Sequence, residues 1–207
     1  MPTRRQTLFT LGNLFVLGGA AQSGASAVVG SSSNASFRVV DDTTGDNSIE
    51  LTPANDPPIY VQTDDDGDVS GIDLDDDSAG LSKRAITRFE DIVEITNTST
   101  DPLQGIYFSF EATSSVLSAE TLDDVENTLQ ATAGANTLDS SGPSGDNLLA
   151  VSSETSVSDG VLGPSESVAF GLQVNLVSSS EPGSFDDLPP SEDYELTLRV
   201  HTEWPDA

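Results

Sequence analysis

Strict alternation of apolar and polar residues marks two stretches near the C-terminus. In residues 168–176 five apolar side chains share one face: Val168, Phe170, Leu172, Val174 and Leu176. Residues 194–201 repeat the pattern with Tyr194, Leu196, Leu198 and Val200. A period of two residues is typical of β-strands with one buried face. The pattern therefore predicts two long strands in this part of the chain.

Residues 89–111 contain two more apolar runs, which flank a polar segment at residues 97–102. The Asn, Ser, Thr, Asp and Pro residues of that segment favour turns. Beyond it, Ile106, Phe108 and Phe110 again alternate with more polar residues. We therefore expect a hairpin at the centre of an antiparallel sheet. Ile92 falls out of phase with its apolar neighbours, which predicts a β-bulge.

In one segment the spacing of apolar residues is helical instead of alternating. In residues 118–131, Leu122, Val125 and Leu129 have helical spacing, and Ser118 or Thr121 is the candidate N-cap. The Gly, Ser and Asn residues of the following segment, 132–147, predict a loop.

Weaker apolar runs complete the prediction. They predict short strands at residues 37–40, 49–51, 59–62 and 148–151. Strands at these intervals with one helical connection are typical of two packed sheets. The predicted fold is an all-β, antiparallel β-sandwich of the jelly-roll or Greek-key type with one short crossover helix.

The net charge of the chain adds most to this interpretation of the sequence. The chain has 35 acidic and 7 basic residues and a net charge of −28. Disorder and folding in concentrated salt are the two explanations, and the regular apolar runs favour the second. At about 1 M salt the Debye length is about 3 Å, so the self-repulsion of an acidic surface is largely screened. We therefore expect a protein of an extreme halophile. Nucleic-acid binding is disfavoured because it needs basic patches.

The absence of cysteine excludes disulfides, zinc–thiolate sites and a lipid anchor on cysteine. The chain must therefore hold together through its apolar core.

The first 27 residues have the organisation of an export signal. Arg4 and Arg5 precede an apolar stretch at residues 8–21, and residues 25–27 have the small side chains that a signal peptidase accepts. The stretch is shorter than the roughly 20 residues that span a bilayer comfortably. The paired arginines indicate twin-arginine export with cleavage after Ala27. The mature domain, residues 28–207, is then extracellular or at the cell surface, without a membrane span.

Acidic loops are expected at residues 63–80 and 178–193. If Gly67 takes the sixth position of a calcium-binding loop, four aspartates fall on ligand positions: Asp64, Asp66, Asp68 and Asp73. Gln62 occupies the first position, where an aspartate is expected, and no flanking helices are evident. An acidic surface loop and a loosely bound cation remain as alternatives. No dedicated metal site is predicted.

No catalytic or cofactor motif is recognisable. The only histidine, His201, lies in a strand of period two, which indicates a solvent-facing residue more than a general base. No nucleophile elbow, P-loop or dinucleotide fingerprint occurs. Four aromatic residues suit either sugar stacking or packing: Tyr60, Tyr107, Tyr194 and Trp204. We expect neither catalytic, cofactor-binding nor metal-binding residues.

Two sequons for N-glycosylation occur, at Asn34 and at Asn97. Asn97 falls in the predicted hairpin turn, where a glycan would project into solvent. Asn34 precedes the first predicted strand. Both are candidate modification sites.

Several features together resemble a known group of proteins. They are the paired-arginine signal, ITNTST at residues 95–100, IYFSF at 106–110 and LGPSESVAFGLQVNL at 162–176. The chain resembles exported haloarchaeal surface proteins that are distantly similar to the TasA/camelysin-like jelly-roll proteins of biofilm matrices and bundling pili. The most specific parts are residues 95–103 and the turn at 162–168, where Ser165 replaces the glycine that commonly follows the proline.

The resemblance implies a mode of assembly. In TasA-like filaments an N-terminal segment of one subunit completes the sheet of the next. Here that segment would be residues 28–41, with Phe37 and Val39 as the inserted side chains.

The expected function is that of a secreted, non-enzymatic structural protein of the cell surface or extracellular matrix, with filament assembly as one mode. Its partners would be further copies of itself or other surface proteins. The alternative is a secreted monomeric binding module for carbohydrate or a surface-layer partner. A small extracellular hydrolase is the third class.

Overall fold

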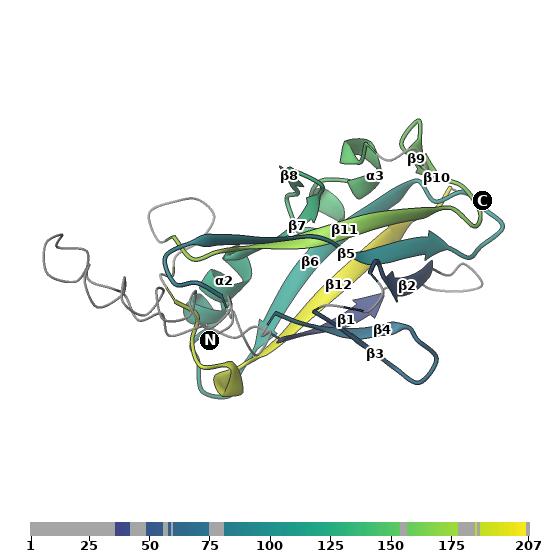
Figure 1. Cartoon of the computed structure of the whole chain (residues 1–207). Coiled ribbons are helices and arrows are strands. Elements are labelled where there is room, and N and C mark those ends of the chain that lie inside the picture. Colours follow the sequence, from purple (N-terminus) through teal and green to yellow (C-terminus); the bar gives the residue numbers. More distant parts are fainter. Residues whose placement is uncertain are drawn as a thin grey trace, which may run out of the picture. The chain divides into compact units, whose positions relative to one another are not determined.

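Two five-stranded β-sheets form the body of the protein in the computed structural model (Figure 1). The structure describes residues 36–41, 49–55, 58, 60–74, 81–153, 157–177, 185 and 187–205. All of them belong to one compact unit, Ser32–Ala207. The predicted signal peptide, residues 1–27, lies outside the described residues, as do parts of both predicted acidic loops.

The first sheet has the strand order β3-β4-β1-β12-β6. Its strands are β1 (Ser36–Asp41), β3 (Val61–Thr63), β4 (Val69–Asp73), β6 (Gly105–Thr113) and β12 (Glu195–Glu203). The second sheet has the order β2-β5-β11-β7-β8. Its strands are β2 (Ile49–Pro53), β5 (Ile86–Asn97), β7 (Leu129–Ala133), β8 (Asn136–Thr137) and β11 (Ser167–Asn175).

Strand pairs in both sheets are antiparallel, except that β1 runs parallel to β12. The prediction of a mostly β protein is confirmed. The remaining described elements are short: β9 (Val157–Ser158), β10 (Val161–Leu162), α2 (Ala119–Asn127), α3 (Leu148–Val151) and the 3-10 turns η1 (Gly142–Ser144) and η2 (Ser191–Asp193).

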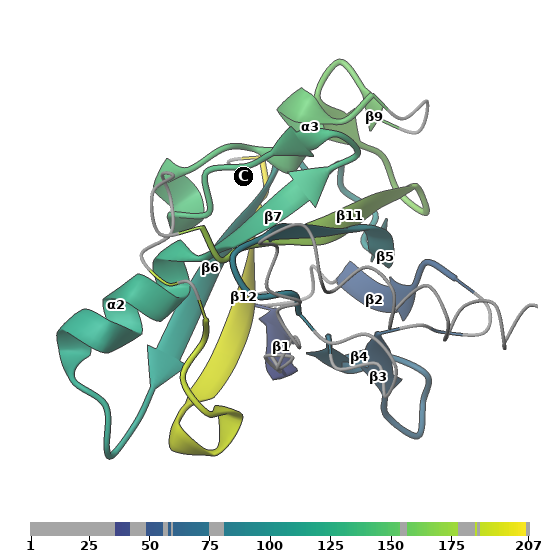
Figure 2. The same ribbon diagram turned by 60° about the vertical axis from the view of Figure 1, so that its left-hand side comes forward.

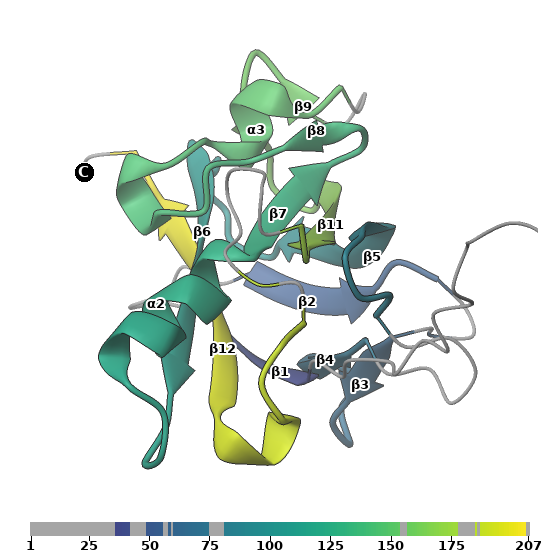
Figure 3. The same ribbon diagram turned by 90° about the vertical axis from the view of Figure 1, so that its left-hand side faces the viewer.

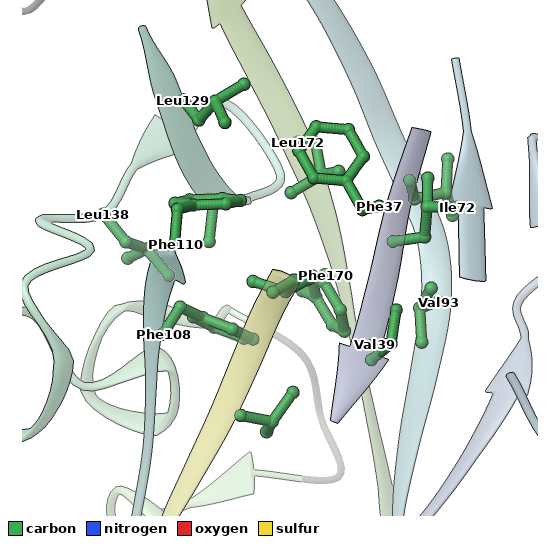
Figure 4. Packing of buried hydrophobic residues seen from close by; sticks show 14 of the residues in the cluster. Phe37, Val39, Ile72, Val93, Phe108, Phe110, Leu129, Leu138, Phe170 and Leu172 are labelled. Carbon is green, nitrogen blue, oxygen red and sulfur yellow. The ribbon is translucent and has the colours of Figure 1, made fainter. Parts of the chain in front are cut away.

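The sheets bury their apolar faces against each other. Figure 3 shows β12, β1, β4 and β3 in one layer and β7, β11 and β5 in the other. The alternation predicted for β11 and β12 is confirmed, because their inward side chains are buried. The rings of Phe108 (β6) and Phe170 (β11) meet across the layers with centroids 4.7 Å apart (Figure 4). Each large apolar side chain buried in this way contributes about 1.5–3 kcal/mol.

The predicted central hairpin at residues 89–111 is wrong. β5 lies in the second sheet between β2 and β11, whereas β6 is an edge strand of the first sheet and pairs with β12. Both edges of β5 are therefore occupied, and residues 98–104 connect one sheet to the other. The partners of both strands come from distant parts of the chain, so a local pattern cannot identify them.

The strand predicted at residues 148–151 is also wrong. These residues form the helix α3, so the described residues contain two short α-helices rather than one. Asn147 caps α3, because its side-chain oxygen accepts a hydrogen bond of 3.0 Å from the Leu149 N–H. An N-cap of this kind favours a helical turn over an extended strand.

Two predicted loops contain strands. Residues 132–147 include the end of β7, all of β8 and the turn η1. Residues 63–80 include β4, in which Val69 and Ile72 are buried. In both places a short strand lies in a segment whose turn-forming or acidic residues are typical of a loop.

The predicted helix within residues 118–131 is confirmed as α2. The Thr121 N–H donates a hydrogen bond of 3.2 Å to Oγ of Ser118, which is the N-cap. The helix ends at Asn127, and Leu129 begins β7 instead of continuing the helical stripe.

The β-bulge predicted at Ile92 is confirmed. Val93 pairs with Phe170 and Phe89 pairs with Leu172, so residues 90–92 oppose Gly171 alone. Asp91 takes a positive φ of 48°. A Cβ atom on Gly171 would lie 2.1 Å from the carbonyl oxygen of Phe89, so this position requires glycine.

Candidate functional site

The strand β1 lies in the middle of the first sheet and is the candidate functional site (Figure 2). It pairs antiparallel with β4 on one side and parallel with β12 on the other. Phe37 and Val39 face the core and are 2% and 8% exposed, whereas Ser36 and Arg38 are exposed. Phe37 and Val39 are thus buried within their own chain, and their insertion into a neighbouring copy stays a prediction.

Phe37 anchors β1 to the rest of the core. Its ring packs edge-to-face against Phe110 of β6, with centroids 6.0 Å apart and an interplanar angle of 60°. Figure 4 shows Ile72 of β4 and Val93 of β5 beside the same strand. The apolar side chains of β1 thus lie in the core between the two layers. Without β1, the first sheet would be divided into the pairs β3–β4 and β12–β6.

The outer strands of both sheets are poorly suited to pairing with another chain. Among the described elements, β8 has 2 residues, β3 has 3, and β2 ends at Pro53. Short edges and proline are common protections against sheet extension. β1, in contrast, lies inside its sheet and pairs with a strand on each side.

The edge of β6 is longer, but side chains close it. The Ile106 N–H donates to Oδ1 of Asn147 (3.1 Å), and the Ala112 N–H donates to Oε1 of Glu126 (2.7 Å). Sequence reasoning missed Asn147 and Glu126, because nothing in their local sequence indicates that they reach the edge of a distant strand.

Asn97, a predicted glycosylation site, is fully buried at the end of β5. Its Nδ2 donates hydrogen bonds to the carbonyl oxygens of Asp101 (2.9 Å) and Leu162 (3.0 Å), and its Oδ1 accepts one from the Ser99 N–H (2.9 Å). The expectation of a solvent-facing glycan on Asn97 does not fit this geometry, because the atom that would carry the sugar is inside the protein. The other sequon, Asn34, lies outside the described residues.

The acidic segment from Asp64 to Asp68 forms the tip of the β3–β4 hairpin. Oδ1 of Asp64 accepts hydrogen bonds of 3.0 Å from the N–H groups of Asp66 and Asp68. Gly67 has a positive φ of 95°, as the turn glycine of the calcium-loop comparison would. Asp73 instead belongs to β4. Strands rather than helices flank this loop.

His201 lies on the outer face of the first sheet. Its Nε2 is 2.8 Å from Oγ of Ser109 on the neighbouring strand β6. Two more diagonal pairs join the same strands, Glu203 with Tyr107 (2.7 Å) and Arg199 with Glu111 (2.6 Å). Cross-strand pairs of this kind stabilise a sheet, so the role expected of His201 as an outward strand residue agrees with its position. The sequence alone does not reveal the contact with Ser109.

The four aromatic residues considered for sugar stacking are dispersed. Tyr60 packs edge-to-face against Phe89 with centroids 4.9 Å apart, and Trp204 donates a hydrogen bond to Thr202. The hydrogen bond to Glu203 is the main cause that raises the pKa of Tyr107. Burial, followed by the charge of Asp187, raises the pKa of Tyr194 to about 12. These side chains do not form one binding platform.

A cavity of about 760 Å³ lies beside β6, α2 and β7. Its lining is largely polar and includes Ser109, Glu126, Asp139, Ser141 and Asp146. In the described part of the chain, no three His, Asp or Glu side chains are grouped so that they could hold a metal ion. The cavity can offer a ligand hydroxyl and carboxylate groups.

None of the helices within the described residues is long and apolar enough to cross a membrane. Comparisons with protein-family models, with curated proteins and with solved structures gave no match to this chain.

Proposed function

We propose that this protein is a secreted, non-enzymatic structural protein of the cell surface or extracellular matrix of an extreme halophile. Its copies assemble into filaments when β1 of one copy takes the place of β1 in the next. The sheets then form a jelly-roll sandwich that each copy completes for its neighbour. The predicted twin-arginine signal at residues 1–27 supports export, and the net charge of −28 supports a halophilic habitat.

The position of β1 carries this proposal. β1 is the first described strand and lies between two strands that come later in the chain, β4 and β12. The same side-chain and backbone contacts form whether β1 comes from the same chain or from another copy. Exchange of an identical element is therefore a low-cost route to assembly, and a strand with alternate buried side chains is suited to it.

A cross-linking experiment separates the two arrangements. Ser36 on β1 pairs with Asp73 on β4, and the chain has no cysteine. We expect the variant Ser36→Cys/Asp73→Cys, assembled in multi-molar NaCl and then oxidised, to give covalent ladders on a denaturing gel. Each single-cysteine variant is the control and gives dimers at most. Only monomers in the double variant would show that β1 stays in its own chain.

Deletion of residues 31–41 tests the role of the segment itself. We expect the shortened protein to form no filaments in electron microscopy and to sediment as a destabilised monomer, because Phe37 and Val39 leave the core. A synthetic peptide of residues 31–41 should restore stability without restoring filaments. Filaments formed by the shortened protein would contradict the proposal.

The cavity beside β6 supports the alternative, a monomeric binding module. Its hydroxyl, amide and carboxylate groups suit a ligand rich in hydroxyl groups, such as a carbohydrate. A mature protein that remains monomeric at all concentrations, and that binds a surface polysaccharide unless Asp139 and Asp146 are replaced by alanine, would favour this alternative.

A further inference from the structure

Arg38 differs from the other basic residues of the described chain. The others each have a partner within the protein: Lys83 with Asp187, Arg88 with Gln173, Arg199 with Glu111, and Arg84 as well. Arg38 is exposed on β1 and, within the described residues, its side chain has neither a hydrogen bond nor an ion pair. An unpaired guanidinium is unexpected in a chain with 35 acidic residues.

The side of β1 that carries Arg38 opens into a hollow of about 480 Å³. The hollow lies over β1, β4 and β12, and its polar lining includes Gln62, Ser70 and Thr197, with Glu195 as its one acidic residue. Gly71 is the neighbour of Arg38 on β4. The Gln62 side chain lies close to this glycine, since a Cβ atom there would be 3.5 Å from its Oε1.

The β3–β4 hairpin presents unpaired acidic groups. Asp65, Asp66 and Asp68 are exposed at its tip, and their carboxylates have no partner within the described residues. The hairpin projects beyond the end of the first sheet (Figure 1). One molecule therefore carries both a free cation in a hollow and a projecting cluster of free anions.

We infer that the acidic hairpin tip of one copy docks into the Arg38 hollow of a second copy. An arginine and a carboxylate form paired, charge-assisted hydrogen bonds, which depend less on long-range attraction than a simple ion pair does. The two surfaces are different patches of the same molecule. Such a contact is heterologous and generates an open chain of subunits when the rotation between them does not close. This inference rests on the proposed filament and adds a specific contact between its copies.

A charge-exchange experiment tests the contact. The variants Arg38→Glu and Asp65→Lys/Asp66→Lys/Asp68→Lys are assembled separately and as a mixture in the same multi-molar NaCl. Each variant alone sets like charges against each other, whereas the mixture restores both opposite-charge contacts. We expect association of Arg38→Glu alone to weaken roughly tenfold or more relative to wild type. The mixture should recover most of that loss in sedimentation and electron microscopy.

Arg199→Glu is the control, because it makes the same charge change on the same face outside the hollow; since it also breaks the pair with Glu111, its folding is checked by circular dichroism. Its mixture with the lysine variant should show no comparable recovery. Equal recovery with Arg199→Glu, or unimpaired assembly of Arg38→Glu alone, would overturn the inference. The Ser36–Asp73 cross-link, measured in the Arg38→Glu background, reports strand exchange independently. Failure of the hairpin contact is thereby distinguished from failure of β1 donation.

Discussion

The side chain of Asn97 donates a hydrogen bond of 3.0 Å to the carbonyl oxygen of Leu162, 65 residues further along the chain. This bond joins the end of β5 to the turn that precedes β11. Backbone bonds reinforce the junction, since the Ser165 N–H donates to the Asn97 carbonyl oxygen (2.7 Å) and the Asn97 N–H to that of Glu166 (2.9 Å). The two most specific parts of the sequence resemblance are therefore in contact.

Replacement of Asn97 by aspartate should destabilise the protein severely. The buried carboxylate would face two carbonyl oxygens that have lost their donor. We expect the free energy of unfolding to fall by about 3 kcal/mol, measured by denaturant titration at constant salt. The exposed Asn136→Asp is the matched control and should change it by about 0.5 kcal/mol or less. Similar losses in both variants would show that the buried amide has no special role.

The same burial predicts that Asn97 is not glycosylated in the folded protein. A sugar on Nδ2 would replace one of its two hydrogens, so at least one of the two hydrogen bonds that Nδ2 donates would be lost. Mass spectrometry of peptides from protein secreted by its native host should find Asn97 unmodified. A glycan at high occupancy on Asn97 in folded protein would contradict the buried position.

Gly171 should not tolerate even one methyl group. A Cβ atom there would lie 2.1 Å from the Phe89 carbonyl oxygen and 2.8 Å from Oγ1 of Thr132. We expect Gly171→Ala to cost about 2–3 kcal/mol in a chemical unfolding experiment. Ala169→Gly, a one-methyl change at the preceding outward position of β11, should cost about 1 kcal/mol or less. Wild-type stability of Gly171→Ala would mean that the bulge adjusts freely.

Tyr194 should make the stability fall at alkaline pH. Its hydroxyl is buried without a hydrogen-bond partner within the described residues, and its pKa is raised to about 12 from 10.0. The contribution of the neutral phenol is complete below pH 10. It is lost as pH rises toward 12, because the unfolded chain releases the proton first.

The variant Tyr194→Phe isolates this effect. At alkaline pH it should reduce the decline in the free energy of unfolding by up to about 1.4 kcal/mol per pH unit. At neutral pH it should be as stable as wild type or more so, because it removes an unsatisfied hydroxyl. Tyr60→Phe is the control. An alkaline decline in Tyr194→Phe equal to that of wild type would exclude Tyr194 as its source.

Dilution of salt should unfold the domain. At about 0.1 M salt the Debye length returns to about 10 Å, so the excess acidic charges repel one another across the surface. Circular dichroism during dialysis from multi-molar to about 0.1 M NaCl should show a cooperative loss of β structure. A fold that persists at the lower salt concentration would count against the halophilic assignment.

Local features were readable from the sequence. The strands β11 and β12, the helix α2 and the bulge at Ile92 each have a periodicity or a cap that acts within a few residues. These features depend on neighbouring residues, and the same pattern forms the same element in many tertiary contexts.

Only the tertiary structure decided which strands pair. β5 and β6 are adjacent in the chain yet lie in different sheets, and β1 pairs with β12 from the far end of the domain. The same tertiary contacts bury Asn97, which the sequence predicted to lie at the surface, and they leave the Arg38 side chain without a partner. Pairing between distant strands depends on how the whole apolar surface is buried at once, and no short segment of sequence contains that information.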